Sequence, residues 1–225
     1  MKKITALVPI KEHSERVPGK NFRGFNGKPL FYWILSELAK VEQIDNIYVN
    51  TDSIRIAELI KEHFPKKVEI INRPSSLCGD EVSMNLIIAH DIGIIDSEHY
   101  IQTHTTNPLL IKDTIEKAIE VYFKNLSNYD SVFSVTRIQS RCFTHDGIGI
   151  NHNPNELIPT QQLSPVYAEN SNFYIFSKKS FEQKQKRIGR SPYMYEMNPY
   201  EAVDIDEEVD FTFAEILHKQ TGGRL

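Results

Sequence analysis

The fold is decided by the stretch Ile4-Thr5-Ala6-Leu7-Val8-Pro9-Ile10, a continuous apolar run that Lys11 ends. A short run that is apolar on both faces is typical of a strand buried inside a sheet. A polar loop follows to about residue 28, and Pro29 then suits the first turn of a helix that ends near Lys40. The first forty residues therefore predict a strand, a loop and a helix, which is the opening unit of an α/β fold.

Strands and helices alternate along the next hundred residues. We expect strands at 47–50, 68–71, 100–103 and 131–135. We expect one helix that contains Ile56 to Phe64, a second at 83–95 and a third at 111–124. Further elements are a strand at 172–176, a possible strand at 193–197 and a closing amphipathic helix at 211–217. This order predicts a mostly parallel sheet with helices on both faces, whose ligands gather at the carboxyl ends of its strands.

The alternation is interrupted between Thr136 and about Val166, where turn residues replace periodic hydrophobicity. A loop of this length inside a compact domain is usually functional or bound by a partner. A chain of 225 residues is long enough to bury a core of its own. We therefore treat residues 1–225 as a single domain, with 137–168 as an insertion in it.

Composition and charge exclude several classes of protein. The formal net charge of −4 argues against a nonspecific nucleic-acid surface, which needs clustered cations. No apolar run approaches the roughly 20 residues that cross a bilayer, and no cleavage site follows the signal-like start. The two cysteines, Cys78 and Cys142, are too few for a disulfide framework. We expect a cytoplasmic protein with no nucleic-acid or membrane partner.

The loop after the first strand is the first candidate site. Lys11, Arg16 and Lys20 lie where an α/β sheet binds anions. The loop is not a Walker A motif, which needs glycine in place of Ser14, and no dinucleotide fingerprint follows the strand. The alternative is that these cations form an ordinary solvated loop.

The second candidate is the segment Asp204-Ile205-Asp206-Glu207. In an extended chain, carboxylates at i and i+2 point the same way, and hard oxygen ligands suit Mg²⁺. The alternative is that Asp206 only caps a helix that starts at Glu207. If this segment and the cationic loop share the carboxyl edge of the sheet, together they form a site for a polyphosphate with Mg²⁺.

Both candidates belong to an ordered series of motifs that spans almost the whole chain. The series comprises Pro9, Ser14, Arg16, Val17, Pro18, Lys20 and Asn21, then Asn26-Gly27-Lys28-Pro29-Leu30, Asn50-Thr51-Asp52, Arg73-Pro74 with Leu77 and Asp80, Thr106-Asn107-Pro108-Leu109, and Asp204-Ile205-Asp206-Glu207. It resembles the acylneuraminate cytidylyltransferases, also called CMP-sialic acid synthetases, and their relatives that activate other nonulosonic acids.

The resemblance implies a fold of the nucleotide-diphospho-sugar transferase type, which is Rossmann-like. It also implies that residues 137–168 form a protruding dimerisation arm that completes the sugar site of a partner in a homodimer. The implied reaction is attack by a sugar-acid hydroxyl on the α-phosphorus of CTP, with Mg²⁺ as cofactor and pyrophosphate as the leaving group.

The resemblance also assigns roles to individual residues. The implied catalytic residues are Lys20, Asp206 and Arg16, and Asp204 and Asp206 would hold the metal. CTP would be bound by Lys11, Ser14, Lys20, Asn21, Arg73, Asp80 and Ser83. The sugar acid would be bound by His104, Thr106, Asn107, Gln161, Gln162, Glu169 and Asn170.

Two alternatives to this function stay open. One is a glycosyltransferase of similar fold that uses a preformed nucleotide sugar, and the other is a catalytically inactive nucleotide-binding subunit. The acceptor is open as well, because the sequence departs from the family pattern around His104 and at Asn170-Ser171.

Overall fold

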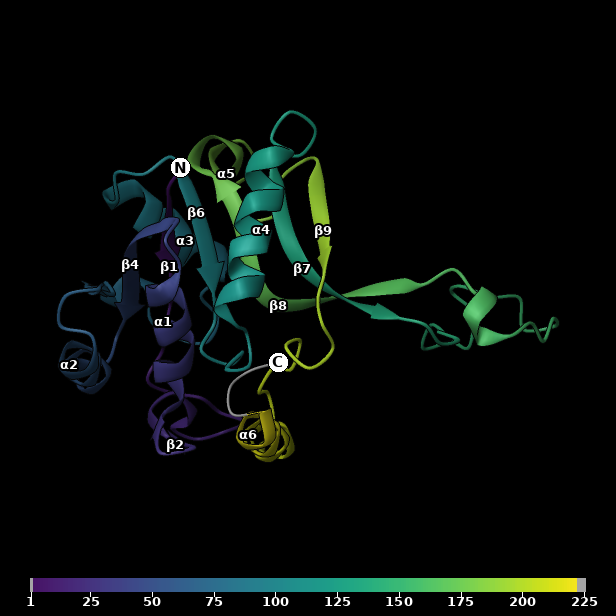
Figure 1. Ribbon diagram of the computed structural model, residues 1–225, viewed down its shortest axis with the longest axis horizontal. Helices are drawn as coiled ribbons and strands as arrows, with labels where there is room; N and C mark the ends of the chain where they lie inside the picture. The colour runs from purple at the N-terminus through teal and green to yellow at the C-terminus, as the bar shows by residue number, and fades with distance from the viewer. Residues whose placement is uncertain (1, 222–225) are drawn as a thin grey trace.

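The computed structural model describes residues 2–221, and its centre is a seven-stranded sheet of order β5-β4-β1-β6-β8-β7-β9 (Figure 1). The strands are β1 (Ile4–Leu7), β4 (Ile44–Thr51), β5 (Val68–Asn72), β6 (His99–Thr103), β7 (Ser131–Ile138), β8 (Val166–Ser177) and β9 (Pro192–Glu196). Strands β2 (Gly24–Phe25) and β3 (Lys28–Pro29) form a separate small hairpin.

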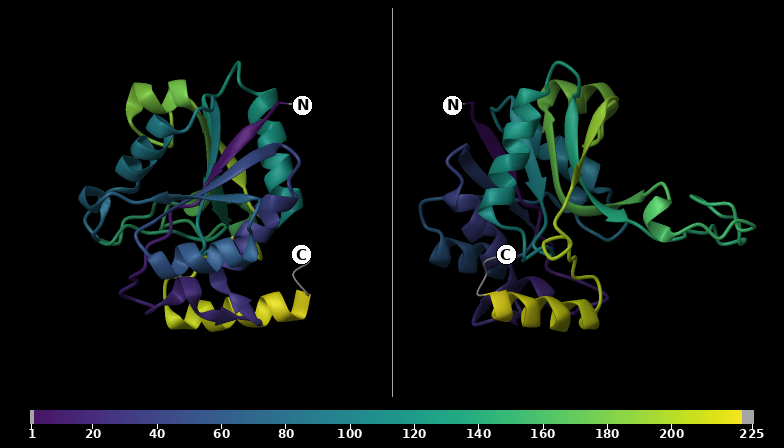
Figure 2. Two further views of the ribbon diagram at one scale, coloured as in Figure 1. Left: turned by 90° about the vertical axis from the view of Figure 1, so that its left-hand side faces the viewer. Right: turned by 45° about the vertical axis from the view of Figure 1, so that its right-hand side comes forward.

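Helices cover both faces of the sheet, as the alternation predicts (Figure 2). The helices are α1 (Leu30–Lys40), α2 (Ile54–His63), α3 (Met84–Ile94), α4 (Lys112–Lys124), α5 (Lys178–Lys184) and α6 (Glu208–Thr221), with short 3-10 turns η1 (Lys20–Phe22), η2 (Ser75–Leu77) and η3 (Thr160–Gln162). None of the helices between residues 2 and 221 combines the length and the apolar character needed to cross a membrane.

The central strands are apolar on both faces because each face meets a different core. Ala6 and Val8 pack with α1, α2 and α4, whereas Leu7 packs with α3 and α5. In β8, Ile175 belongs to the first of these cores and Tyr174 to the second. This explains why the quoted stretch at 4–10 reads as a continuous apolar run.

The sheet is mostly parallel, with β8 as its one reversed strand. Strand β8 pairs antiparallel with both of its neighbours, β6 and β7, while the remaining pairs are parallel. The regular strand at 4–10 ends early, at Leu7, and Pro9 has no amide hydrogen to donate. Val8 and Ile10 still donate to β4 carbonyls, so the extended chain carries the following loop to the carboxyl edge.

Residues 137–168 project from the sheet (Figure 1). Strands β7 and β8 continue to pair out to Ile138 and Val166, so the projection begins as a two-stranded ribbon and ends in turns around η3. We call this segment the arm. The predicted break in the pattern thus falls on a ribbon that leaves the body of the sheet.

Candidate active site

A cavity of about 200 Å³ lies at the carboxyl ends of β1, β5 and β6, the edge at which the sequence predicts a site. Three segments of the chain line it, from the loop after β1, the loop before α3 and the loop after β6. The lining residues are Pro9, Lys11, Ser14, Lys20, Asn21, Arg73, Gly79, Asp80, Val82, Met84, Ile87, His104, Thr105 and Thr106.

The early cationic loop and the late carboxylate segment meet beside this cavity: Lys20 lines it, whereas Arg16, Asp204 and Asp206 do not. Arg16 Nη2 lies 2.6 Å from Asp206 Oδ1, although the two residues are 190 positions apart. Lys20 Nζ donates to the carbonyl oxygen of Ile205 at 2.6 Å. The convergence that the two motifs predict from sequence is therefore confirmed.

Backbone geometry sets the position of Lys20. Gly19 has φ +65°, and a Cβ there would lie 2.9 Å from the Phe22 ring, so the turn before η1 requires glycine. Next to it, the buried Asn21 donates to the carbonyl of Lys11 at 2.7 Å and accepts from the Thr105 hydroxyl. Asn21 therefore fixes the loop against the segment after β6, while also lining the cavity.

The Lys20 ammonium group is partly withdrawn from water. Burial lowers its pKa, and the negative charges of Asp206 and Asp204 oppose that shift. A cation with reduced hydration interacts more strongly with an incoming phosphate than one in bulk water. Lys20 is thus placed to bind an anion in the cavity.

Asp204 and Asp206 differ in their surroundings. Burial raises the pKa of Asp204, and the nearby charge of Asp206 raises it further. Asp204 Oδ1 is buried and has no hydrogen-bond partner within residues 2–221, whereas Asp206 pairs with Arg16. A buried carboxylate oxygen without a donor fits a cation ligand.

No group of three or more metal-ligating side chains gathers anywhere in the described part of the chain. A divalent ion at this site would therefore rely on Asp204 and Asp206, with phosphate oxygens and water completing its shell, as is usual for Mg²⁺. The residues present fit such an ion.

Other predicted CTP-binding residues have structural partners. Lys11 Nζ lies 2.5 Å from Asp80 Oδ1, so this pair bridges two walls of the cavity. Arg73 lines the cavity, yet its Nε donates to Asn50 Oδ1 at 2.7 Å and its Nη2 to the carbonyls of Asn50 and Ile10 at 3.0 and 3.3 Å. Much of the Arg73 hydrogen-bonding capacity thus holds neighbouring strands together.

Ser83 lies beside the cavity but does not line it. Its hydroxyl accepts from the backbone of Asn85 at 3.3 Å, so the side chain caps the N-terminus of α3. The neighbours Val82 and Met84 supply the wall instead.

His104 lines the cavity from the loop after β6. Its Nε2 is 3.1 Å from Gln102 Nε2 and 3.5 Å from Arg187 Nη1. Burial, with the charges of Arg187 and Lys20, lowers the pKa of His104 to about 3. The ring is therefore neutral near pH 7, and because Nε2 faces two N–H donors, the proton belongs on Nδ1. His104 is unsuited to act as a general base through Nε2.

Arg187 is a site residue that the sequence analysis missed. It follows α5, its Nη1 donates to Gln102 Oε1 at 2.5 Å, and its guanidinium lies 3.9 Å from the centre of the Tyr174 ring. The run Lys184-Gln185-Lys186-Arg187 reads as the solvated end of a helix, and no motif in it marks the last residue. Only the folded chain places Arg187 beside His104.

Only some of the predicted acceptor-binding residues line the cavity. Thr106 lines the cavity, while Asn107 is fully buried, donates to the Val203 carbonyl at 3.4 Å and does not line it. Asn170 Nδ2 donates to Thr136 Oγ1 at 3.0 Å, and Glu169 accepts from the Tyr174 hydroxyl.

Gln161 and Gln162 are exposed on η3 in the arm and do not line the cavity of their own chain. Neither glutamine is brought together with Lys20 or Asp206 in the cavity described here. Within one chain, the structure therefore groups only part of the expected acceptor set.

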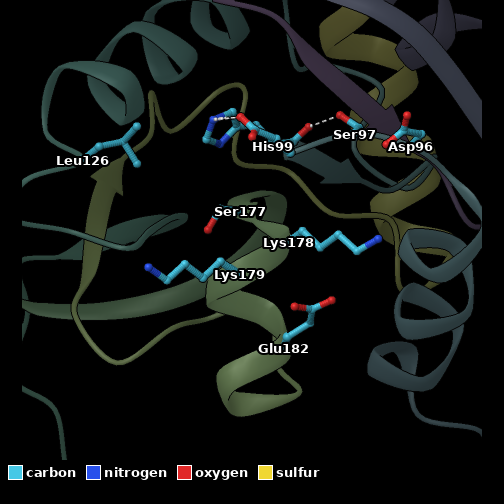
Figure 3. Close-up of a pocket in the computed structure, with 9 residues that line it drawn as sticks. Asp96, Ser97, His99, Leu126, Ser177, Lys178, Lys179 and Glu182 are labelled. Atoms are coloured by element: carbon cyan, nitrogen blue, oxygen red, sulfur yellow. Dashed lines mark hydrogen bonds and ion pairs between the residues drawn. The ribbon is translucent and has the colours of Figure 1, made fainter.

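A larger cavity of about 520 Å³ lies at the opposite edge of the sheet, where β6 begins and β8 ends (Figure 3). Its walls are Asp96, Ser97, Glu98, His99, Leu126, Ser177, Lys178, Lys179 and Glu182. His99 Nδ1 is already bonded to the Tyr122 hydroxyl at 2.9 Å. None of the predicted site residues lies there, so size alone does not identify the active site.

The 200 Å³ cavity that Lys20 lines, together with the carboxylate segment beside it, indicates the class of protein. Fixed cations facing a carboxylate pair, at the carboxyl edge of a mostly parallel sheet, are the parts that an α/β nucleotide-binding protein needs for a polyphosphate. Residues 5–221 match the sequence profile of the family described as Cytidylyltransferase, and the chain belongs to that family of nucleotidyltransferases.

The relatives differ in substrate and length. The chain is 28% identical to N-acylneuraminate cytidylyltransferase A of Danio rerio over 94% of this chain, although it spans only 50% of that relative. It is 24% identical to a pseudaminic acid cytidylyltransferase of Campylobacter jejuni, over 96% of this chain and 97% of the relative.

Solved structures confirm the fold. The chain is similar to a CMP:2-keto-3-deoxy-manno-octonic acid synthetase solved with CTP, with TM-score 0.70, 13% identity, and coverage of 97% of this chain and 99% of that one. It is also similar to a 4-diphosphocytidyl-2C-methyl-D-erythritol synthase from Anaerococcus prevotii, with TM-score 0.68, 14% identity, and coverage of 97% and 96%. The predicted nucleotide-diphospho-sugar transferase type of fold is thus confirmed.

Proposed function

We propose that this protein transfers CMP from CTP to a hydroxyl group of a nonulosonic sugar acid and releases pyrophosphate. The observation that carries the proposal is the convergence of Lys20 and Arg16 with the Asp204–Asp206 segment beside the cavity, in a chain of the cytidylyltransferase family. Several relatives bear the names of enzymes that act on such acids, which supports this acceptor class.

In the proposed reaction, the acceptor oxygen forms a bond to the α-phosphorus while the bond to the β-phosphate breaks. Pyrophosphate takes the electron pair, and the hydroxyl proton passes to solvent. Phosphoryl transfer of this kind depends on alignment and on neutralising charge rather than on a covalent intermediate. Lys20, withdrawn from water and directed to the cavity, stabilises the charge that develops on the leaving phosphate.

Asp204 and Asp206 are the proposed ligands of Mg²⁺, which when bound with CTP supplies further charge neutralisation. In the chain alone, Arg16 pairs with Asp206 and keeps that carboxylate in place. When CTP enters, its phosphates compete with Asp206 for Arg16, so the same arginine can turn to the nucleotide.

We also propose that the protein acts as a homodimer through the arm. Large apolar side chains are exposed along it: Phe143, Ile148, Ile150, Leu157, Ile158 and Tyr167. Leu157 is 91% exposed, which is costly for a single chain and suited to an interface with a second copy. In this arrangement Gln161 and Gln162 reach the acceptor end of the partner's site.

A cytoplasmic location completes the proposal. Both cysteines are free thiols in the structure, which suits a reducing compartment. Cell fractionation with an antibody against the native chain tests this part, and recovery of the protein from a secreted fraction would contradict it.

The decisive experiment incubates the protein with CTP, Mg²⁺ and single acids, namely N-acetylneuraminate, pseudaminate and 8-amino-3,8-dideoxy-manno-octulosonate. Pyrophosphate release and the product mass are followed. We expect a CMP conjugate of at least one acid. The proposal fails if calorimetry shows no CTP binding and no acid is converted, and preferential binding of nucleotide sugars would favour a glycosyltransferase instead.

The oligomeric state is measured separately by sedimentation equilibrium. We expect a dimer for the wild type and dissociation at micromolar concentration for Leu157→Asp. The control is Ile54→Asp, which changes an exposed apolar residue of α2 outside the arm. A monomeric wild type would contradict the dimer.

A further inference from the structure

Arg187 is a half-buried cation without a carboxylate partner. Among residues 2–221, no Asp or Glu oxygen lies within 4.0 Å of its guanidinium nitrogens. Arginine is rarely buried unless an anion pairs with it. Burial lowers the pKa of Arg187, and the charges of Tyr174 and Glu169 oppose this shift, Glu169 without forming an ion pair with it.

Arg187 lines a second hollow, distinct from the nucleotide cavity. Its Nη1 atom is engaged by Gln102 Oε1, while its Nε and Nη2 atoms make no hydrogen bond within the described chain. The hollow has a volume of about 180 Å³ and is lined by Asn85, Glu169, Tyr174, Lys186, Arg187 and Ile188. Lys186 adds a second positive charge to this lining, and Glu169, which accepts from the Tyr174 hydroxyl, adds a negative one.

The guanidinium plane is held rather than mobile. Tyr174 stacks on one side at 3.9 Å, and the buried Gln102 holds Nη1 at 2.5 Å. Tyr174 is itself anchored, because its hydroxyl donates to Glu169. A guanidinium group fixed in this way presents a planar fork, which is the geometry that binds a carboxylate through two parallel hydrogen bonds.

His104 connects this hollow to the nucleotide cavity. The ring lines the nucleotide cavity and its Nε2 lies 3.5 Å from Arg187 Nη1. The two hollows therefore meet at the contact between His104 and Arg187. An acceptor seated against Arg187 would lie across this contact from the occupant of the nucleotide cavity.

We propose that Arg187 binds the carboxylate of the acceptor and so selects sugar acids over neutral sugars. This inference rests on the proposed function, since it names the group that the acceptor end of that site recognises. Gln102 acts as a positioning residue for Arg187, and Lys186 strengthens the local positive field.

The test compares an acid with its methyl ester, which keeps the shape but removes the charge. The probe is whichever of N-acetylneuraminate, pseudaminate or 8-amino-3,8-dideoxy-manno-octulosonate the wild type converts best. For Arg187→Gln we expect the KM for the acid to rise about 10- to 150-fold, the range for losing a charge-assisted hydrogen bond. The KM for CTP should change less than twofold.

The ratio of activity with the acid to activity with the ester separates carboxylate binding from a structural role, because a structural role of Arg187 would leave this ratio unchanged. The wild type should prefer acid to ester by a factor similar to the loss in Arg187→Gln, and the variant should treat the two alike. Arg190→Gln is the matched control, because Arg190 is an exposed residue of the same loop and should keep the wild-type preference.

Arg187→Lys keeps the charge but not the fork, so an intermediate acid preference is expected. This variant carries the test if Arg187→Gln does not fold. An unchanged acid preference in the folded variants, with the wild type active, would overturn the role of Arg187 alone. A wild type that neither binds CTP nor converts any acid would overturn the proposed function, and the role of Arg187 with it.

Discussion

The two ends of the site are built in different ways. At the nucleotide end, Lys11, Arg16 and Lys20 come from one loop and face a short carboxylate segment from the other end of the chain. At the proposed acceptor end, Gln102 and His104 come from the end of β6, and Arg187 comes from the loop after α5, 83 residues beyond His104.

This difference explains why the residues of the nucleotide end can be predicted from the sequence and those of the acceptor end cannot. Binding a triphosphate needs backbone turns and charges at fixed spacing, so its residues cluster into motifs. Recognising an acceptor needs a few side chains that meet only after folding. Substitutions at each end should therefore affect different steps, and the predictions below test this separation.

The largest effect is expected at the carboxylate pair. Asp206→Asn should lower turnover about 1,000-fold or more, because it removes a proposed ligand of Mg²⁺ and the partner of Arg16 in one change. Folding should change little, since this ion pair is solvent-exposed. Steady-state rates at saturating CTP, across a range of Mg²⁺ concentrations, are the measurement.

Glu207→Gln is the control for Asp206→Asn. Its carboxylate oxygen lies 3.9 Å from Arg16 Nη1, compared with 2.6 Å between Asp206 Oδ1 and Arg16 Nη2, so near-normal turnover is expected. If Asp206→Asn retained the Mg²⁺-dependent rates of the wild type, the assignment of the nucleotide end would be wrong.

Lys20→Ala comes next, with an expected loss of about 100- to 1,000-fold in kcat. The reason is that a partly buried cation next to the phosphates is removed while its contact with Ile205 is a single hydrogen bond. The kcat and the thermal midpoint are measured together, and kcat should fall far more. Lys66→Ala, at an exposed lysine outside the site, is the control; a large loss of stability with normal kcat would contradict the role of Lys20.

The burial of His104 should make the free energy of unfolding depend on pH. The folded-state pKa of His104 is about 3, below the unfolded value near 6.5. The folded ring therefore stays neutral while the unfolded ring takes up a proton, so stability is complete above pH 6.5 and falls as the pH drops towards 3. One such group contributes at most about 1.4 kcal/mol per pH unit.

This slope is measured by urea unfolding between pH 6.5 and 5. His104→Gln should show a shallower fall in unfolding free energy than the wild type. His145→Gln, at an exposed histidine of the arm, should keep the wild-type slope. Equal slopes for His104→Gln and the wild type would show that His104 is solvated in the folded chain.

The smallest effect concerns the backbone at the acceptor end. Ser171 has φ +57° in an irregular stretch of β8, where the register with β7 shifts. Glycine takes this conformation without the cost of a side chain, so Ser171→Gly should raise the unfolding free energy by about 0.5 to 1 kcal/mol. Ser127→Gly is the control, because residue 127 has no positive φ, and a destabilised Ser171→Gly would contradict this account.

The sequence predicts the fold well where the apolar pattern is unambiguous. The opening strand is found, although it ends at Leu7 rather than Ile10. The helix after Pro29 is also found, and the break in the pattern at 137–168 falls on the arm. The reversal of β8 is not predicted, because an apolar strand such as 172–176 reads the same in either direction. Register and direction depend on pairing partners that a single sequence does not reveal.

The candidate site is predicted in part for a related reason. Lys20, Asp204 and Asp206 carry motifs and lie together, whereas Ser83 and Asn107 serve as a cap and a buried brace. Arg187 had no sequence signal, because its role depends on a stacking partner and a cavity that form only in three dimensions.

The ion pair between Arg16 and Asp206 also determines at what stage of folding the site is assembled. Closing a loop of 190 residues carries an entropic cost, and the edge-to-face contact between Phe25 and Phe211 at 5.6 Å helps to hold that loop shut. The pair between Arg16 and Asp206 can form only after the segment that carries Asp206 has been synthesised and has folded back onto the loop after β1. If this pair belongs to the proposed CTP site, nucleotide binding therefore requires these two distant segments to be assembled first.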